Sequence, residues 1–530
     1  MPTLTEDKNQ FAFSYLRALY HEFLYGFSFR RRKELLLAGL LLFIQGFAYS
    51  QNHLPYILKK YAPEELRQDF QLMREVLEKA HPSLYLYTPK LEMNHYFDQV
   101  YNNITDSMNE IQFRNLLSFV ISKIRCGHTA VKPSNSFKRM HPVPFPQFPL
   151  YSRVWGDTMV VYHNTSRKDS FITRGTIIKA IDGMPVKQII QSLYQFMPTD
   201  GYSMGVNEIR LTYNFPAYYR NIFGISEKYS IRYLSEEGEV RDTVISAYFP
   251  LADTMDKKKK LPDGVRVKKK KKLTRKDKLA SARDMDIDTS LNLAVIRLNT
   301  FSNGFKLKKF YRQSFRRIAK EGIDNVVIDL RDNGGGNIRN YILLAKYLAD
   351  SSFRVADTVT SIVRSLPYSK HIHSGRLNDI YMIISTRKKK DGQFHFTYFE
   401  DRWFKPKKKN HFGKNIYAVS SGQTFSAAVL FITTLKNQDN FTLVGEETGG
   451  TAYGNNGMLI PDLILPKTKV RISLPLFRMI INPKDGKSGR GIFPDIEVKP
   501  TVESIRSGED LKIKKVLDLI QSGNNQAGGQ

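Results

Sequence analysis

The sequence predicts a multidomain α/β protein, and three patterns support this prediction. The chain has 530 residues, which is too many for one compact hydrophobic core. Apolar residues recur at helical spacing from about 56 to 124, whereas short alternating runs typical of strands fill about 148 to 248. From about 291 to 501, near-continuous apolar strands alternate with helical segments, which indicates a layered α/β domain.

The composition is that of an ordinary folded protein. Hydrophobic residues make up 41% of the chain and aromatic residues 12%, which excludes a mainly disordered protein. Cys126 is the only cysteine, so no internal disulfide can form, and we expect this residue to serve in packing. No metal-ligand cluster or nucleotide-binding loop has convincing spacing, so we expect no metal and no cofactor.

The formal net charge of +30 is unevenly distributed along the chain. Residues 257–278 contain 13 Lys and Arg against two Asp, and smaller basic clusters follow at 388–390 and 407–409. A run this dense repels itself and is typical of a solvated linker. We therefore expect no nucleic-acid partner. The alternative for 257–278 is contact with an anionic membrane surface or another polyanion.

The N-terminal segment has the layout of a secretory signal. Basic residues at 30–33 precede an apolar stretch at 35–44, and a small-x-small ending follows at Ala48 and Ser50. The apolar stretch is shorter than the roughly 20 residues that cross a bilayer. We expect residues 1–50 to be an N-terminal extension with a signal peptide, or a signal-anchor that is not cleaved. Both predict export of the remainder to the periplasm or cell envelope.

The patterns divide the exported part into segments. We expect a helical cap domain at 53–140, a β-rich domain at 145–250, a basic linker at 251–288, an α/β core at 289–505 and a tail at 506–530. Within the β-rich domain, residues 175–186 resemble the PDZ signature of a strand, an Asp182-Gly183 turn and a helix, which implies a peptide-binding groove. The alternative is an ordinary Asp-Gly hairpin.

Two glycine-containing turns of the predicted core could take part in catalysis or ligand binding. Gly334, Gly335 and Gly336 follow the apolar strand NVVIDL, where their N–H groups could hold a phosphate or an oxyanion, or simply form a tight turn. Ser426 lies at the turn between the strand ending at Ser420 and an apolar helix, where the helix dipole favours developing negative charge. The alternative is that Ser426 only caps the helix.

Other candidate residues lie elsewhere in the chain. His128 follows Cys126 and Gly127 at the end of the predicted cap, although a lone histidine is more often structural. Glu446 and Glu447 precede a second glycine-rich turn, and the segment NPKDGKSGRGIFPD follows it. Cys126 and His128 are too close in sequence to form a cysteine-peptidase pair easily, because such residues usually come from distant segments.

The order GHT, PDZ-like module, DLRDNGGG, GQTFSAA, VGEETGGTAYG and GRGIFPDIEV resembles the C-terminal processing (tail-specific) peptidase superfamily, in its tricorn-like and Bacteroidetes branch. The resemblance spans about 56 to 501 and implies a crotonase/ClpP-like α/β catalytic core. The best-known members use a Ser-Lys dyad, but the matching stretch GEETGGT ends here in Thr451. The tricorn-like branch instead takes a histidine base from the upstream domain, and His128 matches that position.

The resemblance also implies the roles of individual residues. Ser426 would be the nucleophile and His128 the general base, and the backbone N–H groups of Gly335 and Ala427 would form the oxyanion hole. The third catalytic residue is expected to be Asp485, with Glu447 as the alternative acid. Asp485 also fits an ordinary Pro-Lys-Asp-Gly turn.

These expectations lead to one principal hypothesis and two alternatives. The principal hypothesis is an exported serine peptidase that cleaves peptides or unfolded and C-terminal protein segments through an acyl-enzyme. The first alternative is a non-catalytic, ligand-binding or peptide-binding member of the same superfamily. The second is a crotonase-like enzyme that transforms acyl groups, since that fold also places glycine-rich N–H pairs at an oxyanion.

Overall fold

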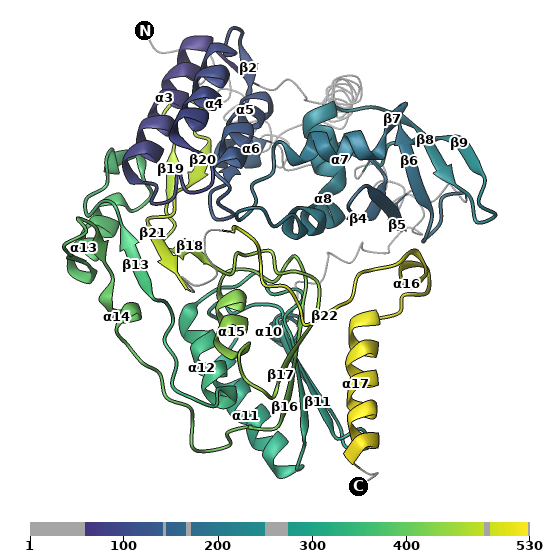
Figure 1. Cartoon of the computed structure of the whole chain (residues 1–530). Helices are drawn as coiled ribbons and strands as arrows, with labels where there is room; N and C mark the ends of the chain where they lie inside the picture. The colour runs from purple at the N-terminus through teal and green to yellow at the C-terminus, as the bar shows by residue number, and fades with distance from the viewer. Residues whose placement is uncertain (1–58, 141–144, 166–170, 250–273, 482–487, 528–530) are drawn as a thin grey trace, which may run out of the picture. The chain divides into compact units, whose positions relative to one another are not determined.

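The computed structural model describes residues 59–140, 145–165, 171–249, 274–481 and 488–527. Within these residues the protein has a mixed α/β, multidomain architecture, as the sequence predicts (Figure 1). The predicted signal segment, most of the basic run and Asp485 lie outside the described residues. None of the described helices is both long enough and apolar enough to span a bilayer.

The helices predicted between 56 and 124 are present as α3 (Pro63–Ala80), α4 (Lys90–Asn102) and α5 (Glu110–Lys123). Their apolar faces meet around fully buried phenylalanines at 70, 97 and 113. Helix α5 begins where the side chain of Asn109 accepts two backbone N–H groups of the first turn. After α5 the chain enters the short strand β3 (Val131–Lys132), and the loop between these two elements carries His128.

The β-rich region contains an antiparallel sheet in the order β4 (Leu150–Trp155), β5 (Thr158–Asn164), β6 (Ile177–Ile181), β8 (Lys228–Leu234) and β9 (Val240–Ser246). Strand β7 (Met184–Pro185) pairs with β6 through the predicted Asp-Gly turn, and the predicted helix follows as α7 (Val186–Tyr194). The prediction that strands fill this whole region is wrong for one segment, which forms the long helix α8 (Gly205–Phe223). Pro216 and the kink at Asn214 interrupt its sequence pattern, but Leu211 and Phe215 pack in the core of the sheet.

The core sheet has the strand order β10 (Arg283–Asp288), β11 (Leu293–Leu298), β12 (Asn325–Asp329), β16 (Asn415–Ser420), β17 (Phe441–Gly445) and β22 (Ile496–Glu497). Strand β10 is antiparallel to β11, and the other pairs are parallel. Strands β11, β12, β16 and β17 are the near-continuous apolar strands that the sequence predicts. Strand β10 lies inside the range assigned to the linker, so the sheet starts before the predicted boundary at 289.

Helices cover both faces of this sheet (Figure 1). One face packs on α11 (Leu307–Lys320), α12 (Ile338–Leu348) and α15 (Ala427–Leu435). The other face packs on α17 (Leu511–Ala527), whose Val516 and Ile520 contact buried valines of the strands. The predicted C-terminal tail is therefore mostly a helix that completes the second layer. The short helices α10 (Arg275–Ala280) and α16 (Val502–Ser507) flank the core.

Smaller sheets connect the core to the helical region. One has the order β14 (Arg387–Lys388), β15 (Phe394–His395), β13 (Thr358–Ser361), β21 (Phe477–Ile480) and β18 (Gly454–Met458). Another pairs β19 (Asp462–Ile464) with β20 (Arg471–Ser473), and β20 with β3. Because β3 directly follows the His128 loop, this pairing fixes the loop against a segment more than 300 residues later in the chain.

The remaining described elements are short or lie at the edges of the molecule. They are β1 (Lys60–Tyr61), β2 (Met108–Asn109), α6 (Asn135–Met140), the 3-10 turn η1 (Ser369–His371), α13 (Gly375–Ser385) and α14 (Thr397–Glu400).

Candidate active site

Ser426 lies at the turn between β16 and α15, as predicted. Its backbone has φ 55° and ψ −119°, a conformation that residues with a side chain rarely adopt and that is often found at functional sites. Its side chain makes no capping hydrogen bond to the helix. The interpretation of Ser426 as a mere helix cap is therefore wrong, and its half-buried hydroxyl is available for chemistry.

Hydrogen bonds hold the turn before Ser426 in place. The buried hydroxyl of Thr424 accepts the Ser421 N–H at 3.0 Å and donates to the Leu330 carbonyl at 2.9 Å. The Phe425 N–H donates to the Asn333 carbonyl at 3.0 Å. Leu330 and Asn333 both follow β12, so the turn before Ser426 is bound directly to the loop that carries the three predicted glycines.

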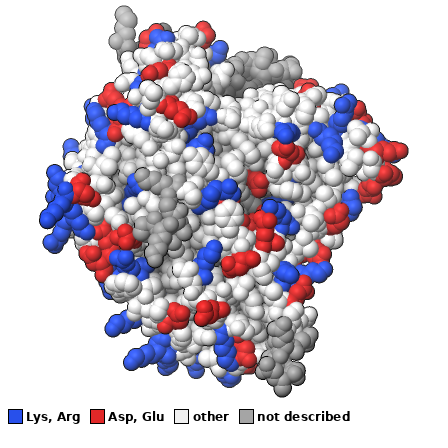
Figure 2. Space-filling model, in the orientation of Figure 1, with Lys and Arg blue, Asp and Glu red and all other residues white. Residues whose placement is uncertain are grey.

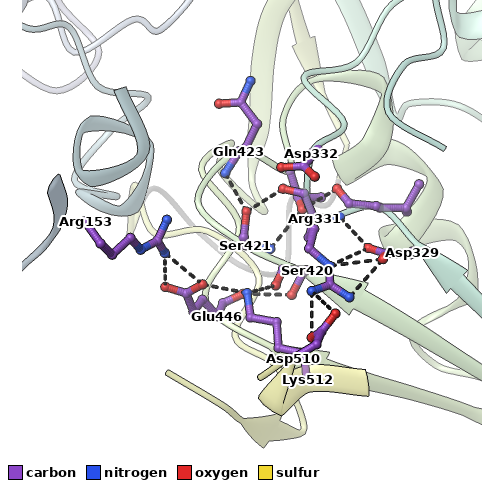
Figure 3. Close-up of polar contacts among 12 residues, drawn as sticks. Arg153, Asp329, Arg331, Asp332, Ser420, Ser421, Gln423, Glu446, Asp510 and Lys512 are labelled. Atoms are coloured by element: carbon purple, nitrogen blue, oxygen red, sulfur yellow. Dashed lines mark hydrogen bonds and ion pairs between the residues drawn. The ribbon is translucent and has the colours of Figure 1, made fainter. Parts of the chain in front are cut away.

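A polar network lies below this turn, at the carboxyl ends of β12, β16 and β17 (Figure 3). The Ser421 hydroxyl donates to the Arg331 carbonyl at 2.5 Å, and the Arg331 guanidinium pairs with Asp329 and Asp510. Glu446 pairs with Arg153 of the β-rich region and with Lys512 of α17. Except for Asp329, these residues line a cavity of about 330 Å³, so the β-rich region, the core and α17 are joined next to the candidate site.

The two predicted oxyanion donors lie side by side. Gly335 has φ +95°, and a Cβ there would lie 2.7 Å from the Ser426 Cβ and 3.0 Å from the Ala427 nitrogen, so only glycine fits. Ala427 supplies the first N–H of α15, at the positive end of the helix dipole. The Gly335 N–H, however, donates to the Asn333 side-chain oxygen at 2.9 Å. One of the two donors is therefore engaged within the protein.

The His128 loop is fixed by contacts with several segments. The Gly127 N–H donates to Asp200 Oδ1 at 3.1 Å, and the Thr129 hydroxyl is hydrogen bonded to His81 Nε2 at 2.8 Å. The Ser473 N–H of β20 donates to the carbonyl of Ala130 at 2.9 Å. The imidazole itself packs on the ring of Phe425, the residue before Ser426, with the ring centroids 4.8 Å apart.

Ser426 and His128 border the same small space. A Cβ added to Gly457 would lie 2.8 Å from Ser426 Oγ and 2.9 Å from His128 Nε2. Asn455 Oδ1 would be 2.9 Å from the same point, and its own amide nitrogen is buried without a partner among the described atoms. The structure thus brings the predicted nucleophile and base together, with Gly457 leaving the space between them open.

The electrostatic environment keeps His128 neutral. Both ring nitrogens are buried and have no hydrogen-bond partner among the described atoms. Burial lowers the pKa of His128 to about 4, and the positive charge of Arg210 acts in the same direction. A neutral imidazole can accept a proton, so the environment of His128 is compatible with a general base at neutral pH.

Peptidase family S41 is the family whose sequence model matches this chain, over residues 292–498. The matched residues resemble the C-terminal processing peptidase superfamily, to which family S41 corresponds. This confirms the resemblance seen in the sequence, and it supports a peptidase of serine type, a class that acts on peptides or proteins. A comparison with curated protein sequences gives no match.

Solved structures agree with the fold of this peptidase. The structure of mature CPAF complexed with lactacystin has a TM-score of 0.60 at 14% sequence identity, covering 88% of this chain and 98% of that chain. The crystal structure of mature CPAF has a TM-score of 0.57 at 14% identity, covering 86% and 96%. At this identity the likeness shows a shared fold.

Asp200 is a buried carboxylate of the peptidase that the sequence analysis did not select. Its two oxygens accept the N–H groups of Gly127 and Thr451, at 3.1 and 3.3 Å. Burial raises the pKa of Asp200 to about 6, and these two N–H groups partly oppose that shift. Asp200 therefore joins the His128 loop to Thr451, the position that matches the lysine of the Ser-Lys dyad.

Among the described residues, Cys126, His128 and Asp200 form the group that could ligate a metal ion, with one ligand atom of each within 4.8 Å of the others. The protein itself already supplies partners to two of them. Cys126 Sγ accepts the Asn456 amide at 3.2 Å, and Asp200 accepts two backbone N–H groups. Burial also raises the pKa of the Cys126 thiol, which disfavours the thiolate that binds metal. These contacts fit the packing role expected for Cys126.

The two candidate acids have different places in the structure. Glu447 pairs with Arg490 at 2.6 Å and accepts the Gly491 N–H at 2.7 Å, so it ties its turn to the segment before Phe-Pro-Asp. The described contacts do not bring Glu447 to His128. Asp485, the preferred candidate, lies outside the described residues.

Sequence reasoning missed Asp200, Asn333, Asn455 and Gly457. Asp200 lies in Thr-Asp-Gly, and Asn455 and Gly457 lie in Gly-Asn-Asn-Gly, both of which are common turn sequences. Neither pattern indicates which distant segment the turn will face. One signal could have indicated Asn455 and Gly457 as site residues, because Gly-Asn-Asn-Gly lies just after the VGEETGGT motif.

Proposed function

We propose that this chain is an exported serine peptidase that cleaves peptides, or unfolded and C-terminal protein segments, through an acyl-enzyme formed on Ser426. The observation that carries the proposal is the shared space of Ser426 Oγ and His128 Nε2 beside Gly457. The strained backbone of Ser426 and the neutral state of His128 support it. A non-catalytic binding protein would have no need of either feature, so we do not favour that alternative.

The reaction follows from the placement of these groups. Ser426 Oγ attacks the peptide carbonyl carbon while His128 Nε2 accepts the hydroxyl proton, and an Oγ–C bond forms. His128 then returns the proton to the leaving amine as the C–N bond breaks. A water molecule, deprotonated in turn by His128, hydrolyses the ester and restores the Ser426 hydroxyl.

The negative oxygen of the tetrahedral intermediate would be stabilised by Ala427 and Gly335. The Ala427 N–H stands at the N-terminus of α15, where the helix dipole adds to the hydrogen bond. The Gly335 N–H would exchange its acceptor, from the Asn333 side chain to the substrate oxygen. A charged oxygen is a stronger acceptor than an amide, which favours this exchange.

The third catalytic residue in this proposal is Asp485, with Glu447 as the alternative. We expect Asp485→Asn to lower kcat about 10²- to 10⁴-fold, because a base without its orienting carboxylate adopts the wrong tautomer. Glu447→Gln should lower it less than tenfold, because Glu447 is already paired with Arg490. Peptide hydrolysis by the two variants decides between the two acids. Equal activity in both variants would contradict a triad completed by either residue.

The region 145–250 would present the substrate in a PDZ-like manner. Strand β6, the Asp-Gly turn and helix α7 occur in the order that the PDZ signature implies. Peptides bind such modules by adding a strand to a sheet edge. The Arg153–Glu446 ion pair supports this role, because it joins the region directly to the turn that follows β17.

A fluorophosphonate probe tests the proposed function directly. The wild-type protein should be labelled at Ser426, labelling should vanish in Ser426→Ala, and it should drop at least about a hundredfold in His128→Ala. Circular dichroism confirms that each variant is folded. A folded wild-type protein that stays unlabelled would show that Ser426 is not an activated nucleophile.

A further inference from the structure

Helix α13 presents apolar side chains to solvent. Large hydrophobic residues on a surface helix usually face the core, yet of the large side chains in α13 only Met382 is buried. The exposed ones form what we name the α13 face, and their exposed fractions run from 44% to 80%. The α13 face consists of Leu377, Ile380, Tyr381, Ile383 and Ile384.

The spacing and anchoring of these residues make them a fixed surface. Leu377, Ile380, Tyr381 and Ile384 follow the i, i+3, i+4, i+7 pattern, so they line one side of the helix. The helix itself is anchored in its middle and near its C-terminus. Asp379 Oδ1 accepts the Leu366 N–H at 2.7 Å, and the Arg364 guanidinium donates to the Ile383 carbonyl at 2.5 Å.

Aromatic side chains extend the α13 face beyond the helix. The ring of Tyr381 stacks near Phe396, with centroids 6.3 Å apart, and Phe396 contacts Tyr398 at the same distance. Tyr398 is 41% exposed, and the guanidinium of Arg402 lies over its ring at 4.9 Å. The apolar surface thus ends in tyrosines and a cation, the side chains that favour a membrane–water interface.

Positive charge follows the helix directly. Arg387, Lys388, Lys389 and Lys390 are all exposed, and β14 is the edge strand of its sheet. Lys389 pairs with Glu400, but in the described part of the chain no carboxylate lies within ion-pair distance of the other three. Figure 2 shows Lys and Arg side chains gathered at the edge of the molecule where Figure 1 places α13.

We propose that the α13 face docks on an anionic phospholipid surface. The aliphatic side chains would enter the boundary between headgroups and acyl chains, while the basic residues after α13 attract the phosphates. A second copy of this chain fits less well as the partner. A symmetric contact would bring the basic residues of the two copies together, and their charges would repel. Lysines on an edge strand also disfavour strand pairing between copies. This surface is separate in sequence from the basic run at 257–278.

A fluorescent label on the α13 face tests the proposal locally in the full-length chain. Ile384→Cys can be labelled selectively with a nitrobenzoxadiazole dye, because the single natural cysteine, Cys126, is 2% exposed. With vesicles of equal parts phosphatidylglycerol and phosphatidylcholine, emission should rise severalfold and be quenched by nitroxide-bearing lipid. Val244→Cys on β9, where the valine is 64% exposed, is the matched control and should not respond.

The charge requirement is tested in the same labelled protein. Neutralising Arg387→Gln, Lys388→Gln and Lys390→Gln together should weaken vesicle binding about a hundredfold. A silent label at 384 on a protein that floats with the vesicles would overturn the proposal, since binding would then occur elsewhere. Emission that rises with protein concentration and without lipid would overturn it in favour of a second copy. Neither readout depends on catalysis, so Ser426→Ala serves equally well.

Discussion

The turn that carries Ser426 and the loop that carries His128 are held in opposite ways. Around Ser426, neighbouring parallel strands fix the turn through the buried Thr424 hydroxyl and the Phe425 N–H. Around His128, contacts from other parts of the chain fix the backbone, but the imidazole has no hydrogen bond among the described residues. The proposed nucleophile is thus positioned by its own sheet, whereas the proposed base depends on tertiary contacts that are distant in sequence.

This difference locates the sensitive part of the site. The Ser426 hydroxyl has little freedom, because the turn before it is held by the hydrogen bonds of Ser421, Thr424 and Phe425. An imidazole without a fixed partner is oriented only by packing on Phe425 and by whatever acid approaches it. Substitutions that act on the space or the loop around His128 should therefore reduce catalysis more than they reduce stability.

The largest effect is expected from Gly457→Ala. The added methyl would lie within 3 Å of Ser426 Oγ and His128 Nε2, so these side-chain atoms must move apart. We expect kcat/KM to fall about a thousandfold or more, because a displacement of about 1 Å at the reacting atoms already costs about a hundredfold. The melting temperature should change little, since Gly457 does not have a positive φ.

Gly413→Ala is the matched control for this substitution. Its added methyl would meet only the His411 ring, at an ordinary contact distance of 3.8 Å, and the residue has no positive φ. Its kcat/KM should equal that of the wild type. Full activity in Gly457→Ala would mean that the nucleophile and base do not work across this space.

A smaller effect is expected from Asp200→Asn. One of the two N–H groups that Asp200 now accepts would face an amide N–H₂ instead, so the loop carrying His128 would shift. We expect kcat/KM to fall about a hundredfold and stability to fall by about 1–3 kcal/mol. Steady-state peptide hydrolysis and urea denaturation measure the two effects.

Asp69→Asn separates the catalytic effect from the stability effect. Asp69 is likewise a buried carboxylate that accepts two backbone N–H groups, those of Lys467 and Thr468, but it belongs to α3. The Asp69→Asn variant should lose about as much stability as Asp200→Asn and keep the kcat/KM of the wild type. Equal losses of activity in both variants would assign Asp200 a purely structural role.

The mildest test is the pH dependence of the wild type. Because burial lowers the pKa of His128 to about 4, kcat/KM should keep its value through pH 6.5, where an exposed histidine would protonate, and fall only near pH 4. Between pH 4 and 6.5, His128 binds fewer protons in the folded protein than in the unfolded chain. Its contribution to the free energy of unfolding is therefore lost as pH falls from about 6.5 to about 4. Thermal denaturation at each pH separates unfolding from titration. An acid limb near pH 6.5 would mean that water reaches the ring in the working enzyme.

Much of the fold could be predicted because local patterns determine it. The apolar runs of β11, β12, β16 and β17 are buried on both faces, and the helical spacing of α3, α5, α11 and α12 is regular. The same reasoning failed for α8, because Pro216 and Asn214 break its local signal while packing on the sheet restores the helix. Strand β10 was missed because its alternation of charged and apolar residues continues directly from the basic run.

The sequence by itself determined the turn at Ser426, since a buried strand, a glycine-containing turn and an apolar helix are all encoded within about 20 neighbouring residues. Only the tertiary structure decided that His128 and Gly457 border this serine. It also decided that Asn333 holds the Gly335 N–H and that Asp200 supports the His128 loop. The physical reason is that strand and helix patterns depend on nearest neighbours. The meeting of distant loops depends on β3 pairing with β20 and on how the covering layers pack, which no local pattern records.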